Sequence, residues 1–236
     1  MIKTTDGYMR LEYFTQTVAA DSRRKEFDIK NHSLIYEGRK LDFLFIGDSI
    51  THYWELNNYF YQNGKLIVNR GIGGDTTAYL KKRFFVDAIQ LKPQYCIMGI
   101  GINDSIDLEG DYWKRLEPRP YAQVISEAQK NIEDIIIQAG EGDLELILTS
   151  ILPINIPISL HEEARIQYVE DMNRWISKTA KDYGKIFVDY YKVLLDPGTG
   201  RIKDGTTYDG LHPNAVGYRI MTEVLRETLK NNNIEI

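Results

Sequence analysis

A serine and a histidine in this chain each stand beside residues that can make them reactive. Ser49 lies in the segment FIGDSIT, directly after an apolar run, and a serine hydroxyl becomes a good nucleophile only when a base removes its proton. His212 follows Asp209 by three residues in the segment YDGLHPN, and the chain has only 4 histidines. A carboxylate at this spacing can accept a hydrogen bond from Nδ1 of the imidazole, which leaves Nε2 to act on a serine hydroxyl. These residue types indicate nucleophilic catalysis by a serine.

Both features also have structural interpretations. Ser49 stands just before a helix that we expect to begin near Thr51, and serine is a preferred N-cap residue. Asp209 and His212 can equally form a buried structural pair. No serine in the chain has glycine at both −2 and +2, so the Gly-x-Ser-x-Gly elbow of ordinary α/β-hydrolases is absent. The local sequence therefore leaves two interpretations of each feature open.

The other histidines are weaker candidates for the base. His52 follows Ser49 by three residues, so on a helix it would approach the hydroxyl, but no acidic residue is placed to orient its ring. His32 belongs to a polar segment that we expect to be peripheral. His161 opens a predicted helix, where a surface or capping role is expected. His212 is thus the predicted base, and His52 is the alternative.

Acyl transfer also needs donors that stabilise the negative charge on the carbonyl oxygen, each contributing about 3–4 kcal/mol in the transition state. The segment GIGGDTT offers the backbone N–H groups of Gly71, Gly73 and Gly74, and the segment GIND offers the side-chain amide of Asn103. Glycine clusters also bind phosphates. However, the chain contains neither G-x-x-x-x-G-K-[ST] nor G-x-G-x-x-G, which argues against nucleotide binding.

Five short apolar runs alternate with helical patterns along the chain. Continuous apolar runs are typical of strands that are covered on both faces. The predicted strands are 41–47, 66–71, 94–101, 144–151 and 185–190. The predicted helices are 76–91, 121–139, 160–183 and about 213–229, with Pro213 in the first turn of the last one, and an N-terminal helix around 13–30. The alternation predicts an α/β fold, a three-layer α/β/α sandwich with a five-stranded parallel sheet.

The unusual residues of this chain follow the predicted strands. The post-strand loops are GDSITHYW, NRGIGGDTT and GIGINDS, and YDGLHPN comes beyond the fifth strand. Active residues of open parallel sheets gather at the carboxyl ends of the strands, so we expect these four loops at one edge. Because no repeat, low-complexity stretch or linker interrupts the chain, we predict a single domain over 1–236, with 1–40 as a helical extension packed on it.

The composition of the chain limits the classes of partner and cofactor that we expect. The chain has 236 residues, 43% of them hydrophobic, and a formal net charge of −5, which argues against nucleic-acid binding. No signal-peptide pattern is visible and no apolar run approaches the roughly 20 residues of a membrane span, so we expect a cytoplasmic protein without membrane insertion. No compact set of His, Cys, Asp and Glu suggests a metal, and no cofactor is expected. Cys96 lies in an apolar run and is predicted to be a buried structural thiol.

The segments GDSIT, NRGIGGDTT, GIND and YDGLHPN resemble, in order and approximate spacing, the four blocks of the SGNH (GDSL-like) hydrolase superfamily. The resemblance spans 43–214 and looks closest to the branch of platelet-activating-factor-acetylhydrolase-like and carbohydrate acetylesterase proteins. It implies a flavodoxin-like topology. Ile50 stands where the GDSL block has leucine, at a position that we expect to pack.

The resemblance also implies roles for individual residues. Ser49 would be the nucleophile, and its own N–H would be the first oxyanion donor. Gly74 would supply the second donor through its backbone and Asn103 the third through its side chain. His212 would be the base and Asp209 the acid that orients it.

The implied function is a serine esterase that forms an acyl-enzyme. We expect short-chain esters, above all acetyl esters of carbohydrates or similar small alcohols, because the chain is polar and shows no amphipathic lid. Trp54, Tyr112 and Trp113 are candidate substrate contacts, with scaffold packing as the alternative. Thioesterase or lysophospholipase activity at the same site is an alternative function, as is a non-enzymatic ligand-binding module. The sequence leaves homo-oligomer formation open.

Overall fold

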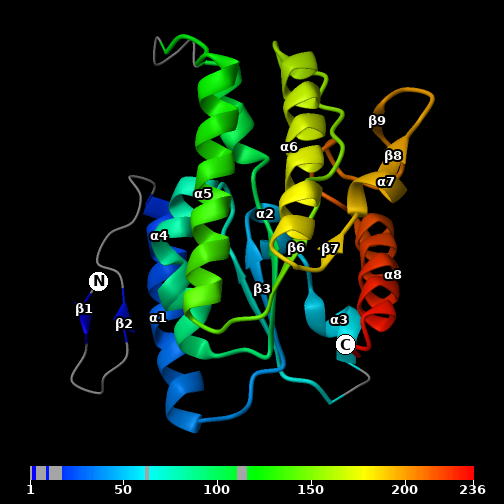
Figure 1. Ribbon diagram of the computed structural model, residues 1–236. Helices are drawn as coiled ribbons and strands as arrows, with labels where there is room; N and C mark the ends of the chain where they lie inside the picture. The colour runs from blue at the N-terminus through cyan, green and yellow to red at the C-terminus, as the bar shows by residue number, and fades with distance from the viewer. Residues whose placement is uncertain (1, 4–8, 11–17, 62–63, 111–115) are drawn as a thin grey trace. The chain divides into compact units, whose positions relative to one another are not determined.

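The computed structural model describes residues 2–3, 9–10, 18–61, 64–110 and 116–236 (Figure 1). The chain forms two compact units, of which the first comprises Met1–Gly99 and Asn131–Ile147 and the second Ile100–Lys130 and Leu148–Ile236. The division passes through helix α5 (Tyr121–Glu141) and strand β6 (Leu146–Thr149). The single domain expected from the sequence stays a prediction.

The five predicted strands are present. They are β3 (Phe43–Gly47), β4 (Ile67–Gly71), β5 (Tyr95–Gly99), β6 and β7 (Phe187–Val188), and the sheet order is β4-β3-β5-β6-β7. The β3–β4, β3–β5 and β6–β7 pairs are parallel. With the strands counted along the chain, this order is the 2-1-3-4-5 order of flavodoxin-like folds. The predicted α/β class and topology are confirmed.

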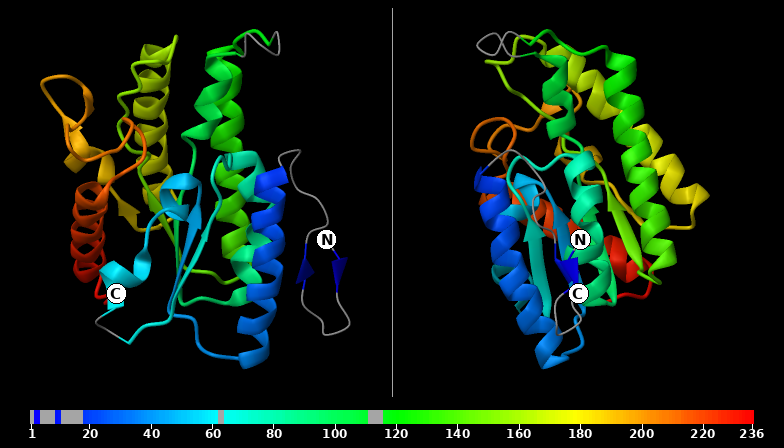
Figure 2. Two further views of the ribbon diagram at one scale, coloured as in Figure 1. Left: turned by 180° about the vertical axis from the view of Figure 1, so that it is seen from behind. Right: turned by 90° about the vertical axis from the view of Figure 1, so that its left-hand side faces the viewer.

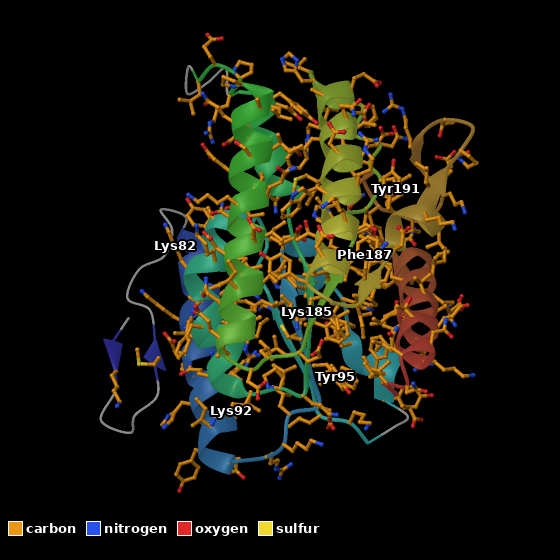
Figure 3. All side chains as sticks on the ribbon, in the orientation of Figure 1. Lys82, Lys92, Tyr95, Lys185, Phe187 and Tyr191 are labelled. Atoms are coloured by element: carbon orange, nitrogen blue, oxygen red, sulfur yellow. The ribbon has the colours of Figure 1, made fainter. Side chains whose placement is uncertain are left out.

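In the first unit, glycines end three neighbouring strands. Gly47 of β3 is paired with Gly71 of β4 and with Gly99 of β5. A Cβ atom at Gly47 would lie 2.0 Å from the Gly99 carbonyl oxygen, so no larger residue fits at this end of the sheet. At the other end of the same strands, the ring of Tyr95 stacks on Phe43 with 5.3 Å between ring centroids (Figure 3). The starts of β3 and β5 thus carry stacked aromatic rings, whereas at the end of β3 the backbones approach too closely for a side chain at Gly47.

Helices of the first unit are α1 (Val18–Glu37), α2 (Ser49–His52), α3 (Leu56–Phe60), α4 (Thr77–Asp87) and the 3₁₀ helix η2 (Ile89–Leu91), and a short hairpin pairs β1 (Ile2–Lys3) with β2 (Met9–Arg10). Helix α1 extends beyond the predicted end at residue 30 because the first breaker is Gly38, which has φ +60°. Residues 13–17 of the predicted helix lie outside the described residues. Helices α1 and α4 lie side by side (Figures 1 and 2).

The second unit contains the 3₁₀ helix η3 (Asn103–Leu108), α6 (Glu162–Asp182), α7 (Tyr190–Leu194), the hairpin of β8 (Leu195–Asp196) and β9 (Arg201–Ile202), and α8 (Ala215–Asn231). Both α6 and α8 contact β7. The prediction that Pro213 lies in the first turn of α8 is wrong. Asn214 caps the helix by accepting from the backbone N–H of Val216 and Gly217, so Pro213 precedes the helix.

Candidate active site

Ser49 is the first residue of α2 and is separated from the carboxyl end of β3 by Asp48 alone. The N-cap is Asp48, whose carboxylate accepts from the backbone N–H of Ile50 at 2.9 Å. Because Asp48 performs the capping, the interpretation of Ser49 as the helix cap is wrong. Ser49 is 6% exposed, which places a nearly buried hydroxyl at the end of a central strand.

A fully buried arginine joins the loops that follow β3 and β4. Arg83 of α4 donates from Nε and Nη2 to Asp75, at 2.8 Å and 2.6 Å. It also donates to the carbonyl oxygens of Arg70 at 2.9 Å and Gly47 at 3.1 Å. Burial raises the pKa of Asp75 to about 6, and the charge of Arg83 opposes this rise. Arg83 thereby connects the strand end before Ser49 with the residue that follows Gly74.

The buried charges continue into α1. Asp87 forms ion pairs with Arg83 and with Arg24, each at 3.2 Å. Asn31 donates to Asp87 at 2.9 Å and accepts from Nε of Arg70 at 2.8 Å. These contacts bind α1 to α4 and β4 through paired polar groups, as buried charges require.

The turn after β4 is Gly71–Gly74, and two side chains contact it from outside. Arg23 of α1 donates from Nε to the carbonyl oxygen of Gly71 at 2.9 Å. His52, the last residue of α2, accepts at Nδ1 from the backbone N–H of Gly73 at 3.3 Å. The two hydrogen bonds attach both halves of the turn to neighbouring helices.

This turn lies beside Ser49. A Cβ atom built on Gly73 would lie 4.0 Å from Cβ of Ser49. Gly74 has φ +77° and would have no atom within 4 Å of an added Cβ. The left-handed φ explains a glycine at this position, and the open surroundings leave its backbone accessible to a ligand. The predicted nucleophile and the predicted second donor therefore belong to one structural group.

The Nδ1 lone pair of His52 already accepts a hydrogen bond from the backbone of Gly73. A backbone N–H can only donate, so Nδ1 of His52 must be the acceptor for Gly73, and the proton of the neutral ring then sits on Nε2. Burial lowers the pKa of His52, the charge of Arg23 lowers it further, and Glu26 opposes both. A neutral ring in this tautomer has no second lone pair to take a proton from Ser49, which argues against His52 as the base.

His212 uses the same ring atom in the opposite way. Its Nδ1 lies 2.7 Å from Oδ2 of Asp209, which accepts the hydrogen bond. The other carboxylate oxygen accepts from the backbone N–H of His212 at 2.8 Å and of Leu211 at 3.0 Å. Partial burial raises the pKa of Asp209, but the hydrogen bonds from His212 and Leu211 outweigh it and lower the pKa. With Nδ1 donating to an ionised carboxylate, the basic lone pair of His212 is on Nε2.

Gly210 shapes the turn between Asp209 and His212. Its φ is +82°, and an added Cβ would lie 1.6 Å from the carbonyl oxygen of Asn155. Asn155 in turn donates its backbone N–H to the carbonyl oxygen of Gly210 at 2.8 Å, and Tyr208 donates to the carbonyl oxygen of His212 at 2.9 Å. The turn can approach the loop after β6 this closely only because residue 210 lacks a side chain.

Asn103 begins η3, which an arginine from α6 supports. Arg165 donates from Nε to the hydroxyl of Ser105 at 3.0 Å and forms an ion pair with Glu109 at 2.7 Å. The Ser105 hydroxyl donates to the carbonyl oxygen of Ile102 at 2.6 Å, one residue before Asn103. These contacts hold the backbone from which the predicted third donor projects.

The structure places the predicted residues in two groups. Ser49 and Gly74 belong to the first unit, and Asn103, Asp209 and His212 belong to the second. Sequence reasoning did not identify the supporting residues Arg23, Arg83 and Arg165, nor the role of His52 as an acceptor. In the sequence, a buried supporting residue of this kind is indicated by a charged residue on an otherwise apolar helix face, as at Arg83 beside Leu80 and Phe84.

Of the three candidate substrate contacts, the structure describes Trp54. Trp54 is 4% exposed, and its ring packs edge-on against Phe45 at 5.6 Å and lies 6.0 Å from Phe60. A ring enclosed in this way has no face for stacking on a sugar, so the packing alternative holds for Trp54. Tyr112 and Trp113 lie outside the described residues. Cys96 is fully buried, as predicted, and burial raises the pKa of its thiol.

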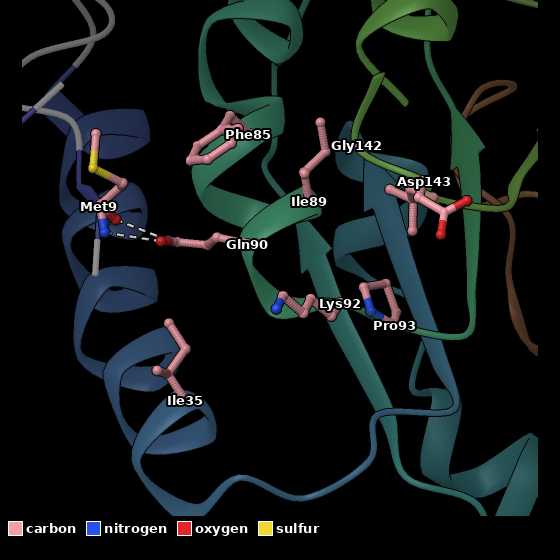
Figure 4. Close-up of a pocket in the computed structure, with 10 residues that line it drawn as sticks. Met9, Ile35, Phe85, Ile89, Gln90, Lys92, Pro93, Gly142 and Asp143 are labelled. Atoms are coloured by element: carbon pink, nitrogen blue, oxygen red, sulfur yellow. Dashed lines mark hydrogen bonds between the residues drawn. The ribbon is translucent and has the colours of Figure 1, made fainter. Parts of the chain in front are cut away.

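A cavity of about 720 Å³ lies at the amino end of β5 in the first unit, away from the end that carries Ser49 (Figure 4). Gln90 donates to the carbonyl oxygen of Met9 and accepts from its N–H, both at 2.8 Å. The remaining described lining residues are Ile35, Phe85, Ile89, Lys92, Pro93, Gly142, Asp143 and Leu144. Because this described lining includes no serine, histidine or cysteine, the cavity offers no nucleophile for acyl transfer.

Metal binding and membrane insertion depend on side-chain clusters and on helix character. Within the described part of the chain, no group of three or more His, Cys, Asp or Glu side chains is arranged to hold a metal ion. Among the described helices, none combines the length and apolar character needed to cross a membrane.

Comparisons with known proteins agree with this architecture. The model of the GDSL-like Lipase/Acylhydrolase family matches residues 45–220. An acetylxylan esterase of Geobacillus stearothermophilus is 24% identical over 221 residues, which cover 82% of this chain and 95% of that protein. An acetylxylan esterase of Xylanibacter ruminicola is 24% identical over 196 residues, which cover 75% of this chain and 36% of that protein. A GDSL-like lipase of Bacteroides thetaiotaomicron has a TM-score of 0.72 at 25% identity, covering 88% of this chain and 97% of that one.

Proposed function

Because the chain belongs to the GDSL-like lipase/acylhydrolase family and is a carboxylic ester hydrolase, we propose that it is a serine esterase that removes acetyl groups from carbohydrates. The observation that carries the substrate class is the similarity to two acetylxylan esterases, one of them matched over 95% of its length. All five residues proposed for the chemistry lie within the matched residues 45–220.

In the proposed reaction, Oγ of Ser49 attacks the acetyl carbonyl carbon while Nε2 of His212 takes the hydroxyl proton. The backbone N–H groups of Ser49 and Gly74 and the side-chain amide of Asn103 donate to the oxyanion, each contributing about 3–4 kcal/mol to the transition state. When the tetrahedral intermediate collapses, the bond to the sugar oxygen breaks and His212 gives that oxygen its proton. Water then attacks the acetyl-enzyme, with His212 again as base, and releases acetate and free Ser49.

Asp209 supports the charged form of the base. Its lowered pKa keeps the carboxylate ionised while His212 becomes an imidazolium, and the hydrogen bond of 2.7 Å holds the ring in one tautomer. The two backbone N–H groups on the other carboxylate oxygen keep the acid in place. The turn therefore combines base and orienting acid in four residues.

Labelling tests the nucleophile. A fluorophosphonate probe should label the wild-type chain on Ser49 and should not label Ser49→Ala. The same substitution should reduce kcat for p-nitrophenyl acetate by about 10⁴-fold or more, with the fold retained by far-UV circular dichroism. Labelling of another serine, or an active Ser49→Ala variant, would refute the assignment.

Substrate profiling tests the acetyl-carbohydrate proposal. We expect kcat/KM to fall from p-nitrophenyl acetate to the butyrate and octanoate, and we expect acetate release from acetylated xylo-oligosaccharides. An acyl-CoA thioester and a lysophospholipid should be poorer substrates than the acetylated sugar. A preference for either of them, or for long acyl chains, would replace the proposed substrate by the corresponding thioesterase or lysophospholipase activity.

A further inference from the structure

The turn Gly71–Gly74 is held by residues with no assigned role in the reaction. We propose that His52 and Arg23 are positioning residues that hold this turn so that its backbone donors face the substrate carbonyl at Ser49. The proposal rests on the proposed function, since it assumes that Gly74 donates to the oxyanion. Arg23 belongs to α1, which lies before the residues 45–220 matched by the family, so the positioning includes an element outside that match.

The turn requires external support because of its own composition. Glycine loses more backbone entropy on ordering than other residues, and Gly73 and Gly74 are adjacent. Gly74 has φ +77°, and no atom would lie within 4 Å of a Cβ there, so side-chain packing does not define its conformation. An oxyanion donor must nevertheless be held within about 0.5 Å of its productive position. The hydrogen bonds that reach the turn from neighbouring helices can supply this order.

His52 supports the second half of the turn. Its Nδ1 accepts from the backbone N–H of Gly73, the residue before the proposed donor. The backbone of His52 also lies against the start of the turn, since a Cβ built on Gly71 would be 2.2 Å from the His52 nitrogen. His52 thus connects α2 to the turn, and α2 also carries Ser49, so nucleophile and donor share a support.

Arg23 supports the first half. Its Nε donates to the carbonyl oxygen of Gly71, and its guanidinium lies over the ring of Phe27 at 5.0 Å from the centroid. Phe27 packs in one buried cluster with Ile72, the next residue of the turn. Helix α1 therefore contacts the turn through one hydrogen bond and one apolar contact.

The charges around His52 keep its acceptor available. The charges of Arg23 and Glu26 of α1 act on the pKa of His52, and the ring of Tyr53 stacks on the His52 ring with 5.0 Å between centroids. Burial lowers the pKa of His52, Arg23 adds to the effect and Glu26 opposes it, so the ring stays neutral below its usual range. Protonation places hydrogen on Nδ1 and removes the acceptor for Gly73. Acid should therefore weaken the support of the turn.

A matched pair of variants separates the acceptor from the bulk of the ring. Asparagine places its Oδ1 near the position of Nδ1 and can accept from Gly73, whereas leucine has similar size without an acceptor. We expect His52→Leu to lower kcat for p-nitrophenyl acetate by about 10-fold to 100-fold with KM changed by less than about 3-fold, because the lost contact acts in the transition state. His52→Asn should recover most of that kcat. Arg23→Met should lower kcat by about 3-fold to 10-fold in the same pattern.

The pH profile is a readout that a merely structural role would not change. The wild type should lose kcat/KM more steeply on the acid side than His52→Asn, because the wild type has a second imidazole whose protonation matters. His32→Leu makes the same substitution on a different helix, α1, and should leave both kcat and the profile unchanged. If His52→Leu fails to fold, the pH profiles of the wild type and of His52→Asn still test whether protonation of His52 affects activity.

Two results would overturn the proposal. Equal kcat values for His52→Leu and His52→Asn would show that the acceptor does not matter, and identical acid limbs in wild type and His52→Asn would show that His52 protonation does not matter. Neither result affects the proposed function, which is tested separately by the labelling, the Ser49→Ala and His212→Ala variants and the substrate profile.

Discussion

Two turns of the molecule each place a histidine three residues after a residue proposed for the chemistry. His52 follows Ser49 in the first unit, and His212 follows Asp209 in the second. In the first case Nδ1 accepts from the backbone N–H of Gly73, and in the second Nδ1 donates to a carboxylate. The same spacing therefore gives opposite tautomers, because a backbone N–H can only donate and an ionised carboxylate can only accept.

The difference assigns different tasks to the two imidazoles. With Nδ1 donating, His212 has its lone pair on Nε2 and can take a proton. With Nδ1 accepting, His52 has no second lone pair, and its contribution is structural. Sequence spacing alone makes both histidines candidates for the base, and the hydrogen-bond partner decides between them.

Asp209→Asn should have the largest effect, because it removes the carboxylate that distinguishes the surroundings of His212 from those of His52. Asparagine can still accept the backbone N–H groups of Leu211 and His212, but its neutral amide no longer stabilises the imidazolium or enforces the tautomer. We expect kcat to fall by about 10⁴-fold with little change in the urea midpoint of unfolding. A fall of less than about 10-fold would show that the Asp209–His212 pair is structural.

The turn that contains His52 and the turn that contains His212 also differ in the contacts that support them. The substitution Arg83→Met tests the support of the first. The loops around the first turn rest on buried charges, so Arg83→Met removes the guanidinium that pairs with Asp75 and one of the two that pair with Asp87, the other being that of Arg24. We expect the free energy of unfolding to fall by about 3–5 kcal/mol in urea titration. Lys82→Met, at an exposed position on the same helix (Figure 3), should change it by less than about 0.5 kcal/mol. Equal effects of the two substitutions would contradict the network's role.

Gly210→Ala tests the close approach that shapes the second turn. Gly205 is a matched control, since its φ of +76° resembles the +82° of Gly210 but no atom would lie within 4 Å of its Cβ. Gly205→Ala should cost about 1 kcal/mol of stability and leave activity unchanged. Gly210→Ala must also displace the Asn155 carbonyl, so we expect a larger loss of stability and about a 100-fold fall in kcat. Similar stability and activity in both variants would exclude the proposed contact.

The smallest expected effect is the pH dependence of stability. His52 has a lowered pKa in the folded chain, so between its ordinary value of about 6.5 and that lowered value the unfolded chain binds more protons. Stability is therefore present above about pH 6.5 and is lost as pH falls, levelling off below the folded pKa. Asp209, also with a lowered pKa, contributes stability that is lost only below about pH 4.

Urea titrations at a series of pH values measure these two windows. His52→Asn should remove the loss that begins near pH 6.5, and Asp209→Asn should remove only the loss that begins near pH 4. If His52→Asn leaves the pH dependence of the free energy of unfolding unchanged between about pH 7.5 and pH 5, the lowered pKa of His52 does not contribute to stability.

Much of this architecture could be predicted from short apolar runs and turn residues. Strand 41–47 is observed as β3 (Phe43–Gly47), and helix 121–139 as α5 (Tyr121–Glu141), because local periodicity reports burial on the sheet and its cover. Asp209 and His212 could be paired from the sequence because only two residues lie between them. Each of these features depends on contacts that are close in sequence.

The features that escaped prediction depend on distant contacts or on competition between neighbours. Arg83 bonds the Gly47 carbonyl 36 residues away, and Arg23 bonds Gly71 48 residues away, so no local pattern reports them. The sequence offers Ser49 as an N-cap, whereas in the structure Asp48 holds that position. The sequence also offers Trp54 as a sugar contact, whereas its ring packs against Phe45.

The most direct test of the central claim compares His212→Ala with His52→Asn in one assay of p-nitrophenyl acetate hydrolysis. We expect His212→Ala to lower kcat by about 10⁴-fold and His52→Asn to retain kcat within about 3-fold, both with native far-UV circular dichroism. An active His212→Ala variant together with an inactive His52→Asn variant would instead make His52 the base.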